Sequence, residues 1–161
     1  MINYADAMVV DLSVFAIANL FNVLLTGIFL CRPWDLRRAE KVLGLATVAL
    51  VVPLILAMLL NLAWGREWWT VVLPGIMVVH LLVELLLDYV LRVDFRGTAL
   101  LWPYLLIFYL AQMGMIGYSF LVGKVFGAVT LATYFLCLLA TWYSYARVGH
   151  GQRVQGGPDL G

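Results

Sequence analysis

Four ionisable side chains recur at every fourth position of the stretch HLLVELLLDYVLR, which otherwise contains only leucine, valine and tyrosine: His80, Glu84, Asp88 and Arg92. An imidazole and a carboxylate four residues apart on a helix can share a proton, hold a cation or act as an acid–base pair. Each step of four residues advances about 6 Å along an α-helix and rotates by about 40°, so the four groups form one winding stripe. The spacing therefore predicts a polar site on one face of a helix.

The chain around this stripe has the composition of a membrane protein. Of its 161 residues, 65% are hydrophobic and only 12% are charged, whereas an ordinary soluble domain is about half apolar and about a quarter charged. The net charge of +1 provides no basic surface for nucleic acid. We therefore expect the lipid bilayer as the main partner and no binding of nucleic acid.

Hydropathy predicts an all-α integral membrane protein, a bundle of five transmembrane helices joined by short connections. The expected domains are a five-helix transmembrane domain over residues 1–149 and a disordered cytoplasmic tail over residues 150–161, which is polar and rich in glycine. Glycines around the last hairpin are expected to let the helices approach closely. They are Gly114, Gly117, Gly123 and Gly127. The predicted spans are about 12–31, 42–64, 68–91, 99–122 and 125–146.

The basic residues divide unevenly between the two sides of such a bundle. Short loops rich in Lys and Arg stay in the cytoplasm, so the count predicts an outside N-terminus and a cytoplasmic C-terminus in the plasma (inner) membrane. The cytoplasmic set would be Arg32, Arg37, Arg38, Lys41, Arg92, Arg96, Arg147 and Arg153, against Arg66 and Lys124 outside.

In this orientation His80 lies near the bilayer midplane, Glu84 in the inner leaflet, Asp88 near its edge and Arg92 at the cytoplasmic mouth. A carboxylate at the depth of Glu84 is costly and usually faces a cavity or a polar partner. Polar residues at matching depths on other spans are expected to complete an inward-facing polar pocket for a small ligand or protons. These residues are Asn22, Thr26, Tyr109, Gln112, Tyr134 and Thr141.

Three functional hypotheses follow. In the first, the pocket around His80 and Glu84 binds or conducts a small ligand or protons. In the second, the chain is a non-catalytic subunit or assembly factor, and its Asn, Thr and Ser side chains only join membrane helices. In the third, His80 and Glu84 are the acid–base pair of an intramembrane enzyme that acts on a lipid. A homo-oligomer and a larger membrane complex both stay open.

The residue inventory argues against several cofactor-dependent classes. A retinal protein needs a lysine inside a helix, but Lys41 and Lys124 stand at span ends. His80 and Glu84 have the spacing of a metal-binding pair, yet only Asp88 follows as a further ligand. We therefore predict no cofactor, no metal and no assigned catalytic residue.

Overall fold

The computed structural model describes residues 4–91 and 98–148. A long first helix and a short 3-10 turn precede a pair of shorter helices: α1 (Tyr4–Cys31), η1 (Arg32–Trp34), α2 (Arg37–Ala49) and α3 (Val51–Ala63). The chain then forms α4 (Trp69–Glu84), which continues into a π-helical segment, η2 (Leu85–Val90), and ends with α5 (Leu101–Val122) and α6 (Lys124–Val148).

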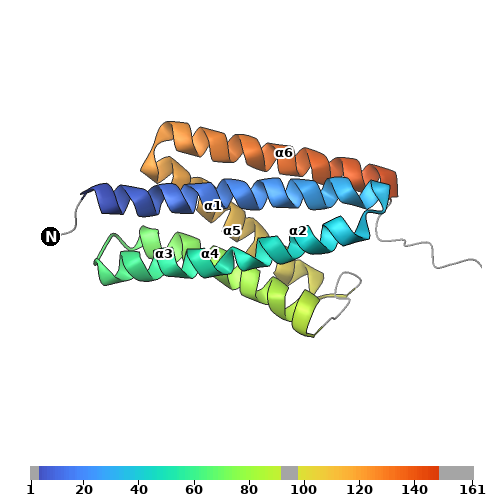
Figure 1. The fold of residues 1–161 in the computed structure, drawn as a ribbon, viewed down its shortest axis with the longest axis horizontal. Coiled ribbons are helices and arrows are strands. Elements are labelled where there is room, and N and C mark those ends of the chain that lie inside the picture. The colour runs from blue at the N-terminus through green and yellow to red at the C-terminus, as the bar shows by residue number, and fades with distance from the viewer. Residues whose placement is uncertain (1–3, 92–97, 149–161) are drawn as a thin grey trace, which may run out of the picture.

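The helices run up and down in one bundle (Figure 1). In this view α1 lies between α6 on one side and α2 with α3 on the other, while α4 and α5 lie behind. The start of α1, the turn between α3 and α4, and the turn between α5 and α6 gather at one end, here called the Arg66 end. The 3-10 turn η1 and the last turns of α6 lie at the opposite end, here called the Arg32 end.

Five helical segments are long and apolar enough to cross a membrane, which confirms the predicted number. Only 28% to 39% of the most apolar window of each segment is buried inside the bundle. The rest of that apolar surface faces outward, as expected for helices surrounded by lipid. The segments cover Tyr4–Trp34, Arg37–Ala63, Trp69–Val90, Leu101–Val122 and Lys124–Arg147.

Two prolines within the spans have different local consequences. Pro53 has no N–H to donate to the carbonyl of Ala49, and the helix is interrupted at Leu50, whose N–H bonds to the Thr47 carbonyl at 3.2 Å. The second span is therefore two helices, α2 and α3.

Pro74 lies inside α4 without ending it. It leaves the carbonyl of Thr70, four residues earlier, without its usual backbone donor. The side-chain amide of Asn61 on α3 donates to that carbonyl at 3.1 Å. Asn61 and Thr70 are both buried, so a neighbouring helix satisfies the group that the proline exposes.

The last two helices form a tight hairpin with Gly123 as the only non-helical residue between them. A Cβ atom at Gly127 would lie 2.2 Å from the ring of Phe120, so only glycine allows this approach. Gly114 packs against Leu73 on α4, whereas nothing lies within 4 Å of a Cβ at Gly117. At Gly123 a Cβ would lie 3.1 Å from the ring of Phe126 in the first turn of α6. The expected close packing is thus present at Gly114, Gly123 and Gly127 but not at Gly117.

Candidate functional site in the bundle core

The structure places His80 and Glu84 together in the interior of the bundle. The His80 side chain is 1% exposed and Glu84 is 12% exposed, and Nε2 of His80 lies 3.5 Å from Oε2 of Glu84. Within the described residues neither ring nitrogen of His80 has a hydrogen-bond partner. A buried polar atom without a hydrogen bond is costly, and such atoms are uncommon enough to need an explanation.

Aromatic rings from two other helices enclose the imidazole. Phe21 of α1 meets it edge-on with ring centroids 6.0 Å apart, and Phe108 of α5 does so at 5.3 Å. The ring of Tyr104, one turn earlier on α5, lies 5.5 Å away. These three rings were not predicted as part of the site, because their spacing resembles that of ordinary core residues. They make the site a tight packing of rings around one imidazole.

The backbone changes its winding directly after Glu84. Residues 85–90 form a π-helical segment, and the N–H of Leu91 donates to the carbonyl of Leu86 at 2.8 Å. The helix that carries the predicted stripe is therefore α-helical from His80 to Glu84 and π-helical at Asp88, which lies inside η2 and is partly buried. Short π-helical segments within membrane or soluble helices occur often at functional sites. Arg92 lies outside the described residues.

Asn22 and Gln112, predicted for the same pocket, are brought together but bond within a separate network. Gln112 donates to the side-chain oxygen of Asn22 at 3.0 Å, and Asn22 donates to Thr133 at 3.0 Å. Thr133 in turn donates to Asn19 at 2.9 Å. Thr133 was missed by the sequence argument because a threonine between an alanine and a tyrosine in an apolar span carries no signal of its own. The network joins α1, α5 and α6, and these side chains satisfy one another.

The remaining predicted residues do not converge on His80. Thr26 and Thr141 each donate to the carbonyl four residues earlier in their own helix, at 2.8 and 2.7 Å. Tyr134 is buried on α6, which packs on α1 and α5, and Tyr109 is 45% exposed on α5. The predicted pocket therefore divides into the His80–Glu84 pair and a separate set of residues between helices.

A second polar cluster lies at the Arg66 end. Arg66 binds both carboxylate oxygens of Asp11, at 2.7 and 2.8 Å, and donates to the side-chain oxygen of Asn61 at 2.9 Å. Tyr118 donates to Asp11 at 2.6 Å and is fully buried. The hydrogen bonds that Arg66 donates to the Asp11 carboxylate raise the pKa of its guanidinium, which stays charged. The cluster joins α1, α3 and α5 and leaves Asp11 well supplied with donors.

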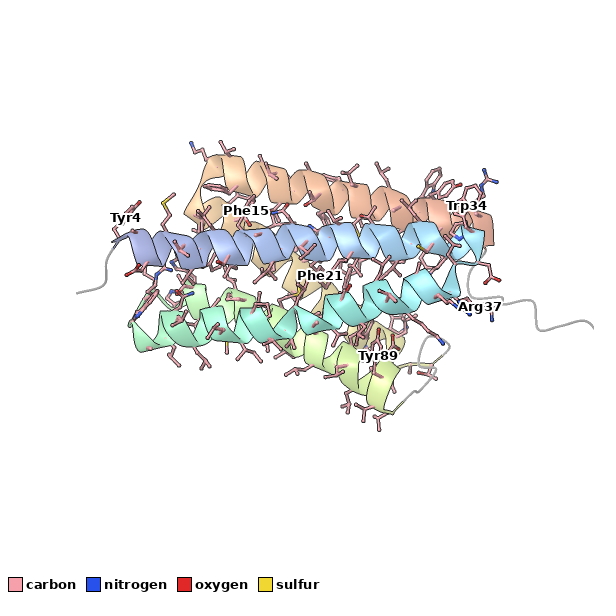
Figure 2. All side chains as sticks on the ribbon, viewed as in Figure 1. Tyr4, Phe15, Phe21, Trp34, Arg37 and Tyr89 are labelled. Atoms are coloured by element: carbon pink, nitrogen blue, oxygen red, sulfur yellow. The ribbon has the colours of Figure 1, made fainter. Side chains whose placement is uncertain are left out.

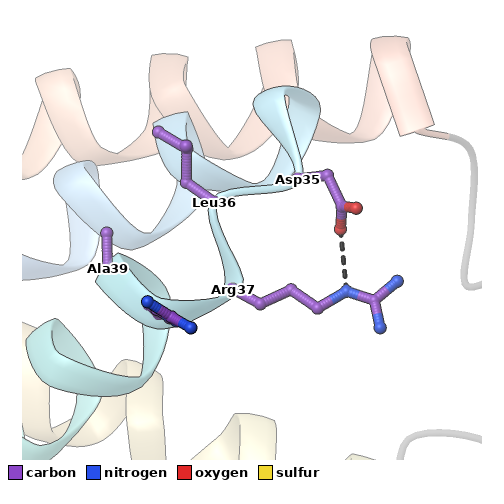
Figure 3. A pocket seen from close by; sticks show the side chains of 5 residues that line it. Asp35, Leu36, Arg37 and Ala39 are labelled. Atoms are coloured by element: carbon purple, nitrogen blue, oxygen red, sulfur yellow. Dashed lines mark hydrogen bonds and ion pairs between the residues drawn. The ribbon is translucent and has the colours of Figure 1, made fainter.

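Two surface hollows lie away from His80. One of about 440 Å³ at the Arg32 end is lined by Asp35, Leu36, Arg37, Arg38 and Ala39, and Figure 3 shows the ion pair of Asp35 and Arg37 on its rim at 2.8 Å. The other, of about 140 Å³, lies between α1 and α3 and has Pro53 in its lining. In the described part of the chain, no three His, Cys, Asp or Glu side chains gather closely enough to hold a metal.

Comparison of the chain with known protein families, with curated proteins and with solved structures finds no match. The function is therefore inferred from the contacts of the chain itself.

Proposed function

We propose that this protein takes up protons at the His80–Glu84 pair inside a five-helix bundle and passes them through its membrane. The observation that carries the proposal is the imidazole of His80, which is 1% exposed, has no hydrogen bond at either nitrogen among the described residues, and lies 3.5 Å from a carboxylate oxygen of Glu84. A proton on Nε2 would convert this contact into a charge-assisted hydrogen bond. The pair thus has two states that differ by one proton.

The packing around the pair favours a proton over a larger ligand. Phe21, Tyr104 and Phe108 surround the imidazole at ring-contact distances, and neither surface hollow includes any of these residues. The titratable groups that face His80 are Glu84 on its own helix and Tyr104 on α5. A membrane carboxylate with a neighbouring imidazole is the chemistry of proton relays.

The orientation belongs to the same proposal. Of the described basic residues, Arg32, Arg37, Arg38, Lys41 and Arg147 lie at the Arg32 end. Arg66 and Lys124 lie at the other end. We propose that the Arg32 end faces the cytoplasm and the N-terminus lies outside, in the plasma (inner) membrane, since short basic loops stay inside.

Proton flux in vesicles tests the proposal. Purified protein is reconstituted with an entrapped pH-sensitive dye, and a membrane potential drives protons inward. Vesicles with the parent protein should acidify faster than empty vesicles, and Glu84→Gln should remove most of the difference because the amide keeps the shape but cannot carry the proton. Glu67→Gln, at an exposed carboxylate of the Arg66 end, is the matched control and should keep the flux. Equal flux in the parent and Glu84→Gln would contradict the proposal.

A second candidate function is that of a subunit within a larger membrane complex. Tyr109 is 45% exposed on α5, within an outward-facing apolar segment where lipid offers its hydroxyl no partner. A helix of another chain with an acceptor at that level would satisfy it. If this is the function, Tyr109→Phe should reduce the size of the complex purified in mild detergent, whereas Tyr143→Phe at the edge of α6 should leave it unchanged.

A further inference from the structure

We infer that protons reach the His80–Glu84 pair from the Arg32 end, along the seam between α2 and η2, and that the side chain of Tyr89 closes this route by packing on Gly44. The inference rests on the proposed function and names the side of entry and the residue that controls it.

Tyr89 fills the seam because Gly44 leaves room for it. Tyr89 lies in η2 beside α2 (Figure 2), and a Cβ atom at Gly44 would be only 2.5 Å from its hydroxyl oxygen. Gly44 itself is buried. The π-helical segment begins directly after Glu84, and Tyr89 lies within it. The hydroxyl thus occupies the position that a side chain on α2 would otherwise take.

Ionisable groups continue from the pair to the Arg32 end along this seam. Glu40 stands four residues before Gly44 on α2, and Glu84 and Asp88 stand five residues and one residue before Tyr89 on the segment that packs against Gly44. Glu40 accepts a hydrogen bond from Arg32 at 3.0 Å, and both of these side chains are about one-third exposed, at 34% and 30%. A series of acidic groups therefore leads from partly exposed Glu40 past Tyr89 to Glu84.

The opposite direction along α4 offers no such series. Toward the Arg66 end, the buried residues that precede His80 are Val78, Met77 and Pro74, which have no ionisable group. The next polar contacts on this helix are those of Thr70, whose hydroxyl donates to the Glu67 carbonyl at 2.8 Å and whose own carbonyl is bonded to Asn61. Among the described residues of α4, no ionisable group thus leads from the pair toward the Arg66 end.

The rate of proton exchange at His80 tests this route. The chain has two histidines, so a His150→Gln background leaves one imidazole, whose exchange between neutral and charged forms can be followed by NMR line shape in lipid nanodiscs. Tyr89→Ala should open the seam and make the exchange severalfold faster. The matched control is Tyr143→Ala, which removes a tyrosine ring from α6 at the same end of the bundle and should leave the rate unchanged.

Two smaller substitutions test the same route in case Tyr89→Ala disturbs the fold. Tyr89→Phe removes only the hydroxyl and should accelerate exchange less than Tyr89→Ala does. Adding Gly44→Ala to Tyr89→Phe places a methyl group where the hydroxyl lay, and should return the rate toward that of the parent. An exchange rate that is the same in the parent, Tyr89→Phe and Tyr89→Ala would overturn the route while leaving the proposed function intact. An imidazole that never titrates in the parent would instead overturn the proposed function.

Discussion

At the scale of single residues, the polar groups of the core differ in whether their hydrogen bonds are satisfied. The side chains of Asn22, Gln112 and Asn61 have hydrogen-bond partners on neighbouring helices, as expected for residues that join membrane helices. His80 is as deeply buried, but its ring nitrogens have no hydrogen bond within the described residues. This difference separates a structural role from a candidate site more sharply than burial or residue type does.

Asn61 should stabilise the fold mainly through the carbonyl that Pro74 leaves without a donor. Asn61→Leu leaves the buried Thr70 carbonyl unsatisfied, which should lower the free energy of unfolding by about 1–3 kcal/mol. In a Pro74→Ala background a backbone N–H returns to that carbonyl, so Asn61→Leu should cost clearly less there. Equilibrium unfolding in detergent measures the cost of Asn61→Leu in the parent and in the Pro74→Ala background. Equal costs in the two backgrounds would show that the Arg66 contact of Asn61 matters instead.

Arg66 should not be replaceable by lysine. Its guanidinium binds both oxygens of Asp11, and a lysine ammonium cannot reproduce this two-point contact. Arg66→Lys should therefore lower the free energy of unfolding by about 1–3 kcal/mol, and Arg37→Lys, whose pair with Asp35 is 72% and 76% exposed, should have little effect. Thermal unfolding of the two variants side by side gives the comparison. A similar loss in both would contradict the structural role given to the Arg66 cluster.

At the scale of elements, hydropathy and loop length were enough to predict five spans, because twenty or so apolar residues between short polar turns allow little else. The sequence also showed where prolines stand, but not their effect: Pro53 interrupts its helix, whereas Pro74 is accommodated by Asn61 from another helix. The π-helical winding after Glu84 was not predictable, since hydropathy does not distinguish a π-helical segment from an α-helix. Asn22 and Gln112 could be grouped from the sequence because they are expected at the same depth in the membrane. Their separation from His80 depends on how each helix is rotated about its own axis, and depth alone does not determine that rotation.

The hairpin of α5 and α6 gives a paired test of close packing. Gly127→Ala places a methyl group against the Phe120 ring, where a Cβ would lie 2.2 Å away, so the helices must separate and the protein should be destabilised by about 1–3 kcal/mol. At Gly117 there is open space for a Cβ, and Gly117→Ala should be neutral or stabilise the helix by up to about 1 kcal/mol. The free energies of unfolding of Gly127→Ala and Gly117→Ala, measured in detergent, give the comparison. The account of the hairpin fails if the two variants are equally stable.

At the scale of the whole molecule, the bundle has two chemically different ends. At the Arg66 end, an ion pair between Asp11 of α1 and Arg66 in the turn before α4 joins these two elements. The Arg32 end carries several exposed arginines and a lysine. The positive-inside rule then orients the molecule, and the acidic series from Glu40 to Glu84 opens toward the basic, cytoplasmic end under this proposal. The orientation and the route of entry are thus linked.

Cysteine labelling in intact cells tests the orientation. In a Cys31→Ser background, which removes the native thiol near the Arg32 end, Glu67→Cys should react with an impermeant reagent added outside. Asp35→Cys should react only after the membrane is made permeable. Both positions are exposed, so accessibility to the reagent decides the result. Ready labelling of Asp35→Cys in intact cells would reverse the orientation and the direction of entry.

The central claim is that the imidazole enclosed by Phe21, Tyr104 and Phe108 takes up a proton next to Glu84. The most direct measurement is the NMR titration of His80 in the His150→Gln background in nanodiscs, from acid to alkaline pH on both sides of the ordinary imidazole pKa of about 6.5. The account predicts a single reversible titration of the ring, altered by Glu84→Gln and unchanged by Glu67→Gln. A ring that stays in one protonation state throughout, or that titrates identically in Glu84→Gln, would contradict it.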